Sequence, residues 1–182
     1  MTKTLTLKEY YHAEIIGGFE KKFSWFKVFK RARRSKRCNF MFWYRMAYVL
    51  YRKKSKACKS LSNSIALKLM KRYSVEIMLG AEIGEGFNLG HNVGIVITKS
   101  CIIGKNCTIR QNTTIGADFK KDEPIIIGDN VSIGANTCII GSGIKIGNNV
   151  NIGAMSFINK DIPADSTYIT IKESRIIEHK NK

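Results

Sequence analysis

The chain has 182 residues, 44% of them apolar, and a formal net charge of +17 at pH 7. This composition is typical of a folded globular domain with a small additional segment, and it excludes a disordered chain. The charge is concentrated in residues 1–76, which hold 20 Lys+Arg and 4 Asp+Glu, whereas 13 of the 15 glycines follow residue 76. We therefore expect a basic, aromatic-rich helical region at 1–75, a main domain at 76–168 and a C-terminal tail at 169–182.

The five cysteines form no CxxC motif, and their odd number leaves one without an intramolecular partner. We expect reduced, mostly buried thiols in a cytoplasmic protein. The first 14 residues are polar and partly acidic, unlike a signal peptide. The longest apolar run, at 40–51, has 12 residues and contains Arg45, so it is too short to cross a bilayer. The cysteines are Cys38, Cys58, Cys101, Cys107 and Cys138.

Residues 1–20 are expected to form a weak helix or a frayed lead-in that ends at Gly17-Gly18. Residues 21–37 hold nine basic residues among 17, interleaved with aromatic ones. Charge alone leaves three interpretations open: a solvated helix face, a surface for anionic lipid or glycan, and a nucleic-acid surface. No nucleic-acid recognition motif accompanies the charge, so we expect no nucleic-acid partner. The interleaved aromatic residues are Phe23, Trp25, Phe26 and Phe29.

Two further helices are expected before the main domain. The first covers residues 39–54, because apolar residues recur there with helical spacing. The second is expected to be capped by Ser60 or Ser62 and to bury Ile65 and Leu69, with Met70 as a further candidate. Both should cover the N-terminal end of the repeats that follow, since the first coil of a solenoid exposes apolar surface and unpaired strand edges. The apolar face of the first helix consists of Phe40, Tyr44, Ala47, Tyr48 and Tyr51.

From Ile83 to Ile158 an aliphatic residue followed by a small or polar one recurs with a step of six, interrupted by insertions after which the step resumes. A period of six predicts a hexapeptide β-helix, in which each aliphatic residue points into a triangular coil. A β-sandwich would give spacings of about 8–12 residues and alternating polarity, which are not seen. The repeated aliphatic positions are Ile83, Leu89, Ile97, Ile103, Ile109, Ile115, Ile127, Ile133, Ile140, Ile146, Ile152 and Ile158.

One interruption, at 117–124, is polar and ends in Pro124, so it predicts a loop that leaves one corner of the coil. Such a loop is either functional or a tolerated surface insertion. The repeats stop at Pro163, and residues 169–171 could form a last strand. Because aliphatic side chains fill the interior, any site must lie on an outer face or between neighbouring prisms.

His91 is the only histidine within the repeats. It lies two residues after the inward Leu89 and is expected on a strand, facing outward. An outward imidazole is suited to a general base, although most exposed histidines are ordinary surface residues.

The segment 76–97, with Leu89-Gly-His-Asn-Val-Gly94 at its centre, resembles the start of the left-handed β-helix in the serine acetyltransferase group of hexapeptide acyltransferases. The upstream helix at 42–48 resembles that of smaller, polysaccharide-modifying members. The resemblance covers about residues 40–168 and implies a left-handed parallel β-helix, acetyl-CoA as the acetyl donor and no metal. It also implies a homotrimer with three sites in the grooves between prisms and a loop that reaches the neighbour. The similar segments continue through 113–116, 127–135, 139–147 and 151–163.

The resemblance assigns roles to individual residues. His91 matches the catalytic base, and Glu76, fifteen positions earlier, matches the acid that orients it. A backbone N–H near Gly116-Ala117 matches the oxyanion donor. The coenzyme is expected along Gly134-Ala135 and Gly153-Ala154, with Lys160 near a phosphate. Asn92, Asp122 and Glu123 are expected at the acceptor.

Two departures from the family bear on the acceptor. Gly90 stands where serine acetyltransferases have an acid, and Asp122-Glu123 stands where they have Arg-His. Since an amino-acid carboxylate is best met by an arginine, we expect a sugar or glycan acceptor, such as a capsule, O-antigen or exopolysaccharide precursor. Serine O-acetylation in cysteine biosynthesis and a non-catalytic scaffold remain the alternatives. A cytoplasmic protein in peripheral contact with the inner face of the membrane would suit the basic N-terminal region.

Overall fold

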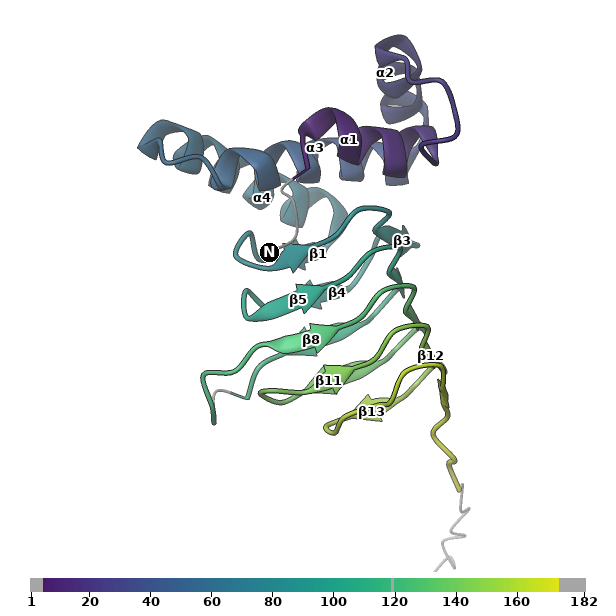
Figure 1. Ribbon diagram of the computed structural model, residues 1–182. Helices are drawn as coiled ribbons and strands as arrows, with labels where there is room; N and C mark the ends of the chain where they lie inside the picture. The colour runs from purple at the N-terminus through teal and green to yellow at the C-terminus, as the bar shows by residue number, and fades with distance from the viewer. Residues whose placement is uncertain (1–4, 119, 174–182) are drawn as a thin grey trace, which may run out of the picture.

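The computed structural model describes residues 5–118 and 120–173. Three parallel sheets wrap around a common core as a triangular prism, and the N-terminal helices lie across one end of it (Figure 1). The model therefore confirms a parallel β-helix with a small helical region. The last helix ends at Tyr73 and the first strand begins at Val75.

The first helical segment is better ordered than expected. α1 (Leu7–Tyr11) starts with a capping box between Thr6 and Glu9 and continues into a π-helical turn, η1 (His12–Ile16). Gly17 ends it with a left-handed backbone, at φ 88°, as the Gly-Gly pair predicts. Of the two expected forms, the helix is confirmed and the frayed lead-in was wrong, because this segment packs apolar side chains against the other helices. Its buried apolar residues are Tyr10, Tyr11, Ile15 and Ile16.

Three longer helices follow: α2 (Trp25–Arg34), α3 (Lys36–Tyr51) and α4 (Lys56–Tyr73). The expected inner face of α3 is confirmed, except that Tyr51 is only half-buried. The expected cap of α4 was wrong, because Ser55 caps it and its hydroxyl accepts a hydrogen bond from the Cys58 amide. The first turn of α4 contains two lysines, so the spacing of apolar residues does not reveal where the helix begins. Leu69 is buried as expected, whereas Met70 is 36% exposed.

The strands visit three sheets in turn, so that three strands complete one coil. In the described part of the chain, strands of neighbouring coils pair in parallel. Sheet A consists of β1 (Val75–Ile77), β4 (Ile95–Ile97), β7 (Thr114–Gly116), β10 (Cys138–Ile140) and β13 (Phe157–Ile158). Sheet B consists of β2 (Glu82–Ile83), β5 (Cys101–Ile103), β8 (Ile125–Ile127) and β11 (Lys145–Ile146). Sheet C consists of β3 (Asn88–Gly90), β6 (Thr108–Arg110), β9 (Ser132–Ile133), β12 (Asn151–Ile152) and β14 (Thr167–Tyr168).

The repeated aliphatic positions form the core of the prism. Eleven of the twelve are at most 2% exposed. The exception is Ile140, which is half-buried on the outer face, while Ile139 points inward with 0% exposure. Ile139 keeps the step of six from Ile133, and one extra residue then follows before Ile146. The extra residue therefore lies one repeat later than the sequence pattern predicted, after Ile139 rather than before Ile140.

The corners of the prism depend on left-handed residues, and asparagine tolerates that conformation best after glycine. At the corner between sheets B and C, side-chain hydrogen bonds link four such residues in a column. Asn106 donates to Asn130 at 3.1 Å, Asn130 to Asn149 at 3.0 Å and Asn149 to Asp165 at 2.7 Å. These bonds run along the prism axis and connect one coil to the next.

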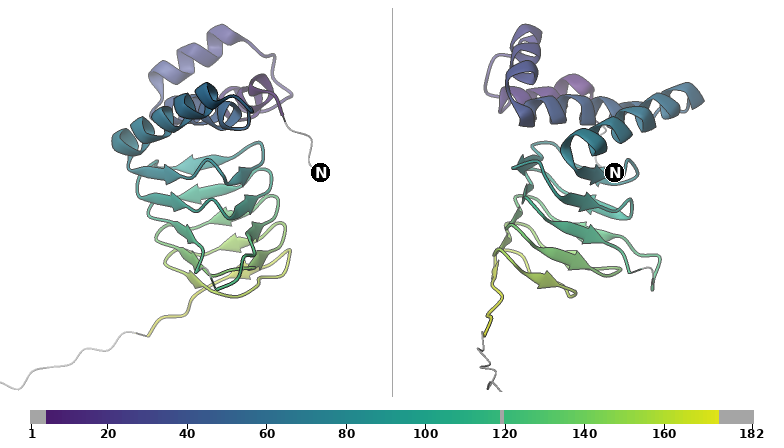
Figure 2. Two further views of the ribbon diagram at one scale, coloured as in Figure 1. Left: turned by 90° about the vertical axis from the view of Figure 1, so that its left-hand side faces the viewer. Right: turned by 180° about the vertical axis from the view of Figure 1, so that it is seen from behind.

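The helical region covers the first coil, as expected (Figure 2). Arg45 of α3 donates to the carbonyl oxygen of Ile83 at 2.9 Å, and the Tyr48 hydroxyl accepts from the Ile83 amide at 3.1 Å. Glu14 accepts from the amide of Phe87 at 3.2 Å. Backbone groups of the first coil that have no coil above them are therefore paired with helix side chains.

The remaining expectations on the thiols and the tail have mixed outcomes. All five cysteines are unpaired, and Cys38, Cys101 and Cys107 are buried. No helix within the described residues is long and apolar enough to span a membrane. The last strand is β14 rather than 169–171, where Ile171 is 90% exposed. Residues 174–182 of the expected tail lie outside the described residues.

Candidate functional site

His91 lies in a corner turn, not on a strand as expected. It directly follows β3, has a left-handed backbone at φ 57°, and is exposed. The cause is an insertion of two residues in this turn. Four residues (91–94) separate β3 from β4 here, whereas two (111–112) fill the same interval on the next coil, as the strand register shows. The longer turn bends the chain so that the imidazole stands at the corner between sheets C and A.

Two buried polar atoms near this turn have no hydrogen-bond partner among the described residues. They are Nδ2 of Asn92, whose residue is only 4% exposed, and Oε1 of Gln111 on the next coil. An unpaired buried polar group costs about 1–3 kcal/mol, so such groups are uncommon unless a ligand or another chain meets them. Asn92 was expected at the acceptor, and these atoms are consistent with that role. Gln111 was missed, because a glutamine in a turn looks like any polar corner residue.

Glu76 is half-buried at the centre of β1, with its side chain on the outer face of sheet A. Its segment lies next to the His91 turn, since Gly94 donates its amide to the carbonyl oxygen of Ser74 at 2.8 Å. Within the described part of the chain, Glu76 and His91 share no hydrogen bond or ion pair. The orienting role of Glu76 therefore stays a prediction.

Glu76 also lines an open cavity of about 330 Å³ between α4 and the first coil. Most of its wall is apolar, and Lys99 is the one basic residue among those that line it. Apolar clefts with a few charged groups are the usual form of ligand and partner sites. The apolar side chains in the wall include Tyr51, Leu67, Met70 and Met78.

The loop at 117–124 leaves the corner between sheets A and B. Gly116 ends β7, and Asp122 and Glu123 are exposed. The base of the loop is fixed to the next coil, because Ser142 donates to Asp118 at 2.6 Å and Gly143 donates to the carbonyl oxygen of Glu123 at 3.2 Å. The Ser142 hydroxyl lowers the pKa of Asp118 below its ordinary value.

The loop and His91 occupy opposite edges of sheet A. A single chain therefore does not bring His91 together with Gly116, Ala117, Asp122 or Glu123. Lys160 follows β13 and lies at the loop's corner, not at the corner of His91.

The four small residues expected at the coenzyme share the corner of His91. Gly134-Ala135 and Gly153-Ala154 lie on successive coils, since β9 pairs with β12 in register. A Cβ on Gly134 would come within 2.4 Å of the Ala154 backbone nitrogen. Coil stacking alone therefore requires glycine at 134, and the expected role of these residues in binding the coenzyme stays a prediction. Within residues 5–118 and 120–173, no group of three or more His, Cys, Asp or Glu side chains could hold a metal ion.

A family model for the hexapeptide repeat of succinyl-transferase matches residues 124–160. The serine acetyltransferase of Helicobacter pylori strain J99 is 30% identical over 139 residues, which cover 73% of this chain and 77% of the relative. The chain belongs to the serine acetyltransferase-like hexapeptide acyltransferases. The family resemblance of the sequence is thereby confirmed.

Other members of the family are longer than this chain. Mitochondrial serine acetyltransferase 3 of Arabidopsis thaliana is 37% identical over 113 residues, which cover 61% of this chain and 29% of the relative. The chloroplastic enzyme 1 of the same plant is 36% identical over 128 residues, or 69% of this chain and 40% of the relative. The chain thus spans less than half the length of these two relatives.

Solved structures of family members share the fold. Serine acetyltransferase isoform 3 from Entamoeba histolytica, in complex with cysteine, gives a TM-score of 0.72 at 27% identity and covers 95% of this chain and 60% of its own. A serine acetyltransferase in complex with CoA gives a TM-score of 0.63 at 28% identity, over 71% of this chain and 52% of its own. The first match includes the helical region as well as the prism.

Proposed function

We propose that this protein is an acetyl-CoA-dependent O-acetyltransferase that uses His91 as its general base. The observation that carries the proposal is the inserted turn, which presents an exposed imidazole at a corner beside two unpaired buried polar atoms. Membership of a family whose named relatives are acetyltransferases supports the donor. A scaffold without catalysis would need neither the longer turn nor the unpaired groups.

In the proposed reaction, His91 accepts the proton of the acceptor hydroxyl while the hydroxyl oxygen attacks the thioester carbonyl carbon. The negative charge that develops on the carbonyl oxygen requires a donor, for which the backbone N–H near Gly116-Ala117 is the candidate. When the C–S bond breaks, the imidazolium returns its proton to the departing thiolate. General base catalysis of this kind contributes typically ~10²–10⁴-fold to the rate.

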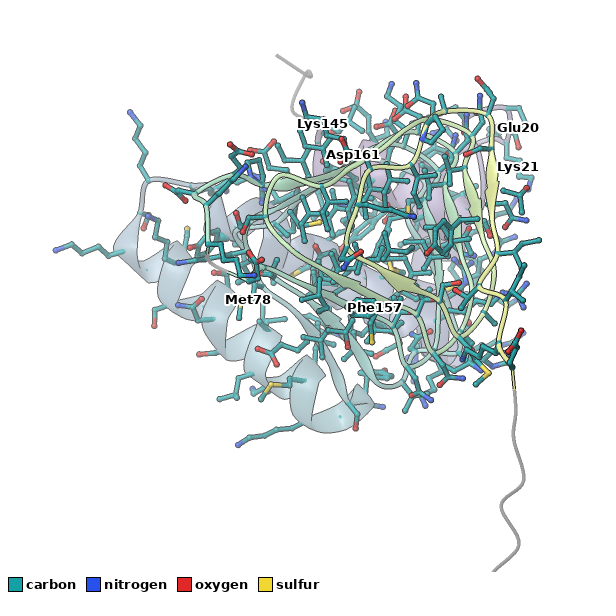
Figure 3. All side chains as sticks on the ribbon, turned by 90° about the horizontal axis from the view of Figure 1, so that it is seen from below. Glu20, Lys21, Met78, Lys145, Phe157 and Asp161 are labelled. Atoms are coloured by element: carbon teal, nitrogen blue, oxygen red, sulfur yellow. The ribbon has the colours of Figure 1, made fainter. Side chains whose placement is uncertain are left out.

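A homotrimer would complete this site. His91 and the loop lie at opposite edges of sheet A, so a second prism that packs beside the first can bring a loop to an imidazole. The outward faces of sheets A and B carry exposed apolar side chains suited to such packing: Val96, Ile102, Ile126 and Phe157. The outer face of sheet C carries mainly polar side chains instead. Figure 3 shows Phe157 of sheet A and Lys145 of sheet B on different sides of the prism.

The acceptor favoured by the relatives is serine, because every relative described above is named a serine acetyltransferase. This supports the alternative over the sugar acceptor that the sequence argument preferred. The sugar remains a second candidate on one observation. Asp122 and Glu123 are exposed acids in the loop, and neither pairs with a basic side chain within the described residues. Two unpaired carboxylates would repel the carboxylate of serine and could accept hydrogen bonds from sugar hydroxyls.

The test is the release of free coenzyme A from acetyl-CoA with serine and with a panel of mono- and oligosaccharides. Turnover with serine supports the first acceptor, and turnover with a sugar alone supports the second. The paired variant Asp122→Arg/Glu123→His should increase turnover with serine if these acids exclude it. Lack of turnover with every acceptor, by a trimer that binds acetyl-CoA, would contradict the proposed catalysis.

A further inference from the structure

The outer helix α2 exposes aromatic side chains that a soluble helix would usually bury. Phe26 is 75% exposed, Phe29 51% and Trp25 46%. The helix is held to the protein by Val28 and Ala32, which are buried on its inner side. At roughly 100° per residue, Trp25, Phe29 and Phe26 form one strip along the outer flank of the helix. Exposed aromatic residues that gather in a strip indicate contact with another surface.

Basic side chains lie beside this strip without acidic partners. Lys27, Lys30, Arg33 and Arg34 are exposed, and none forms an ion pair with a described residue. Arg31 differs, because it donates to the carbonyl oxygens of Ile15 and Ile16 at 2.7 and 2.8 Å and so belongs to the fold. Two acids of the helical region are engaged elsewhere: Glu14 is buried against Arg45, and Glu20 pairs with Lys21.

The position of α2 makes this flank accessible. It lies on the far side of α3 from the prism, at the end of the molecule opposite the last coil (Figures 1 and 2). If prisms associate side by side with parallel axes, as the proposed trimer requires, every copy of α2 lies at the same end. Three weak contacts on one plane then act together, which raises the overall affinity without any new interaction.

We propose that α2 docks the protein onto an anionic phospholipid surface. Its aromatic strip would enter the headgroup region, where aromatic rings are favoured, and the four basic side chains would meet lipid phosphates. Duplex nucleic acid offers the same charge but no interface for Phe26, whose ring makes no contact with another aromatic ring in the described residues. The proposal does not depend on the acetyl transfer proposed above.

The experiment measures co-sedimentation of the full chain with vesicles of phosphatidylcholine alone and of phosphatidylcholine with phosphatidylglycerol. We expect binding only to the anionic vesicles, weakened by salt. The variant Lys27→Gln/Lys30→Gln/Arg33→Gln/Arg34→Gln should reduce partitioning by roughly tenfold or more, and Phe26→Ala should reduce it at unchanged charge. The matched control is Lys53→Gln/Lys54→Gln/Lys56→Gln/Lys59→Gln, which removes the same charge from exposed positions after α3 and in the first turn of α4.

Fluorescence of Trp25 gives a second readout. The chain has two tryptophans, so Trp43→Phe leaves Trp25 as the only one. We expect its emission to shift to the blue when anionic vesicles are added. The proposal is overturned if the control variant loses as much binding as the α2 variant, or if neutral and anionic vesicles bind equally. It is also overturned if vesicles do not bind while a DNA duplex does. The same holds if the α2 variants change only the oligomeric mass measured by light scattering and leave vesicle binding unchanged.

Discussion

The carboxylate of Glu14 and the guanidinium of Arg45 form an ion pair at 2.5 Å in which both side chains are fully buried. Arg45 also stacks on the ring of Tyr10, with its Cζ 4.0 Å from the ring centroid. Burial alone would lower the pKa of Arg45, but the carboxylate of Glu14 raises it above its ordinary value, so the guanidinium stays charged. This pair joins the helical region to the first coil, because both side chains also bond to the backbone of residues 83–87.

Removal of one member of this pair should strongly destabilise the protein. Arg45→Met leaves a buried carboxylate without a counter-ion, which typically costs about 3–5 kcal/mol. Urea unfolding followed by circular dichroism measures the change. The matched control is Glu20→Gln, which breaks the exposed pair with Lys21 and should change the free energy of unfolding by less than about 1 kcal/mol. If Arg45→Met lost as little stability as the control, the packing of the N-terminal helices on the first coil would not depend on the pair.

His91→Asn should abolish most of the activity while preserving the fold. Asparagine adopts the left-handed conformation that His91 holds at φ 57°, so the backbone of the turn is retained. Loss of the general base should lower kcat by ~10²–10⁴-fold. The measurement is coenzyme A release, with thermal unfolding as the control for folding. Full activity in a folded His91→Asn protein would move the base to another residue.

Deletion of Asn92 and Val93 tests the inserted turn directly. The shortened turn would match the two-residue turn at 111–112 on the next coil, so the rungs can still stack. The deletion also removes the unpaired Nδ2 of Asn92. We expect a free energy of unfolding within about 1–3 kcal/mol of that of the parent, or above it, because removal of a buried unpaired group relieves a cost of this size. Acetyl transfer should be lost, since the imidazole would shift to the position that Gln111 holds on the next coil. Activity near that of the parent would contradict the proposed purpose of the insertion.

The hexad pattern allowed the β-helix and its inward residues to be predicted, because each rung repeats the same inside-outside rule. Ile140 was misplaced because two adjacent isoleucines leave the period undecided at a one-residue insertion. The ion pair between Glu14 and Arg45 could not be predicted, since they lie 31 residues apart on helices whose packing depends on the whole N-terminal helical region. His91 was predicted on a strand because the spacing of the inward aliphatic residues reveals an insertion but not which residues form the turn.

Alkaline pH should destabilise the fold through the buried thiols. Burial raises the pKa of Cys101 to about 12, and it raises that of Cys107 as well. The unfolded thiol loses its proton first, near pH 8.5, so folding stability is intact below that pH and falls as the pH rises toward 12. Each thiol contributes up to ~1.4 kcal/mol per pH unit in this window. Urea unfolding at pH 8 and pH 10 should show a smaller difference for Cys101→Ala than for the parent. An equal difference would assign the loss to other groups.

Asn136 allows the two functions of a corner asparagine to be separated. Its backbone is left-handed at φ 57°, and its side-chain oxygen accepts a hydrogen bond from Asn112 at 3.1 Å. Asn136→Gly keeps the conformation accessible and removes only the hydrogen bond, worth about 0.5–1.5 kcal/mol. Asn136→Ala removes the bond and adds the strain of a left-handed residue with a Cβ, about 1–2 kcal/mol more. Urea unfolding should therefore rank the parent above the glycine variant and the glycine variant above the alanine variant. If alanine proved at least as stable as glycine, backbone conformation would not be what selects asparagine here, and the side-chain hydrogen bond with Asn112 alone would account for it.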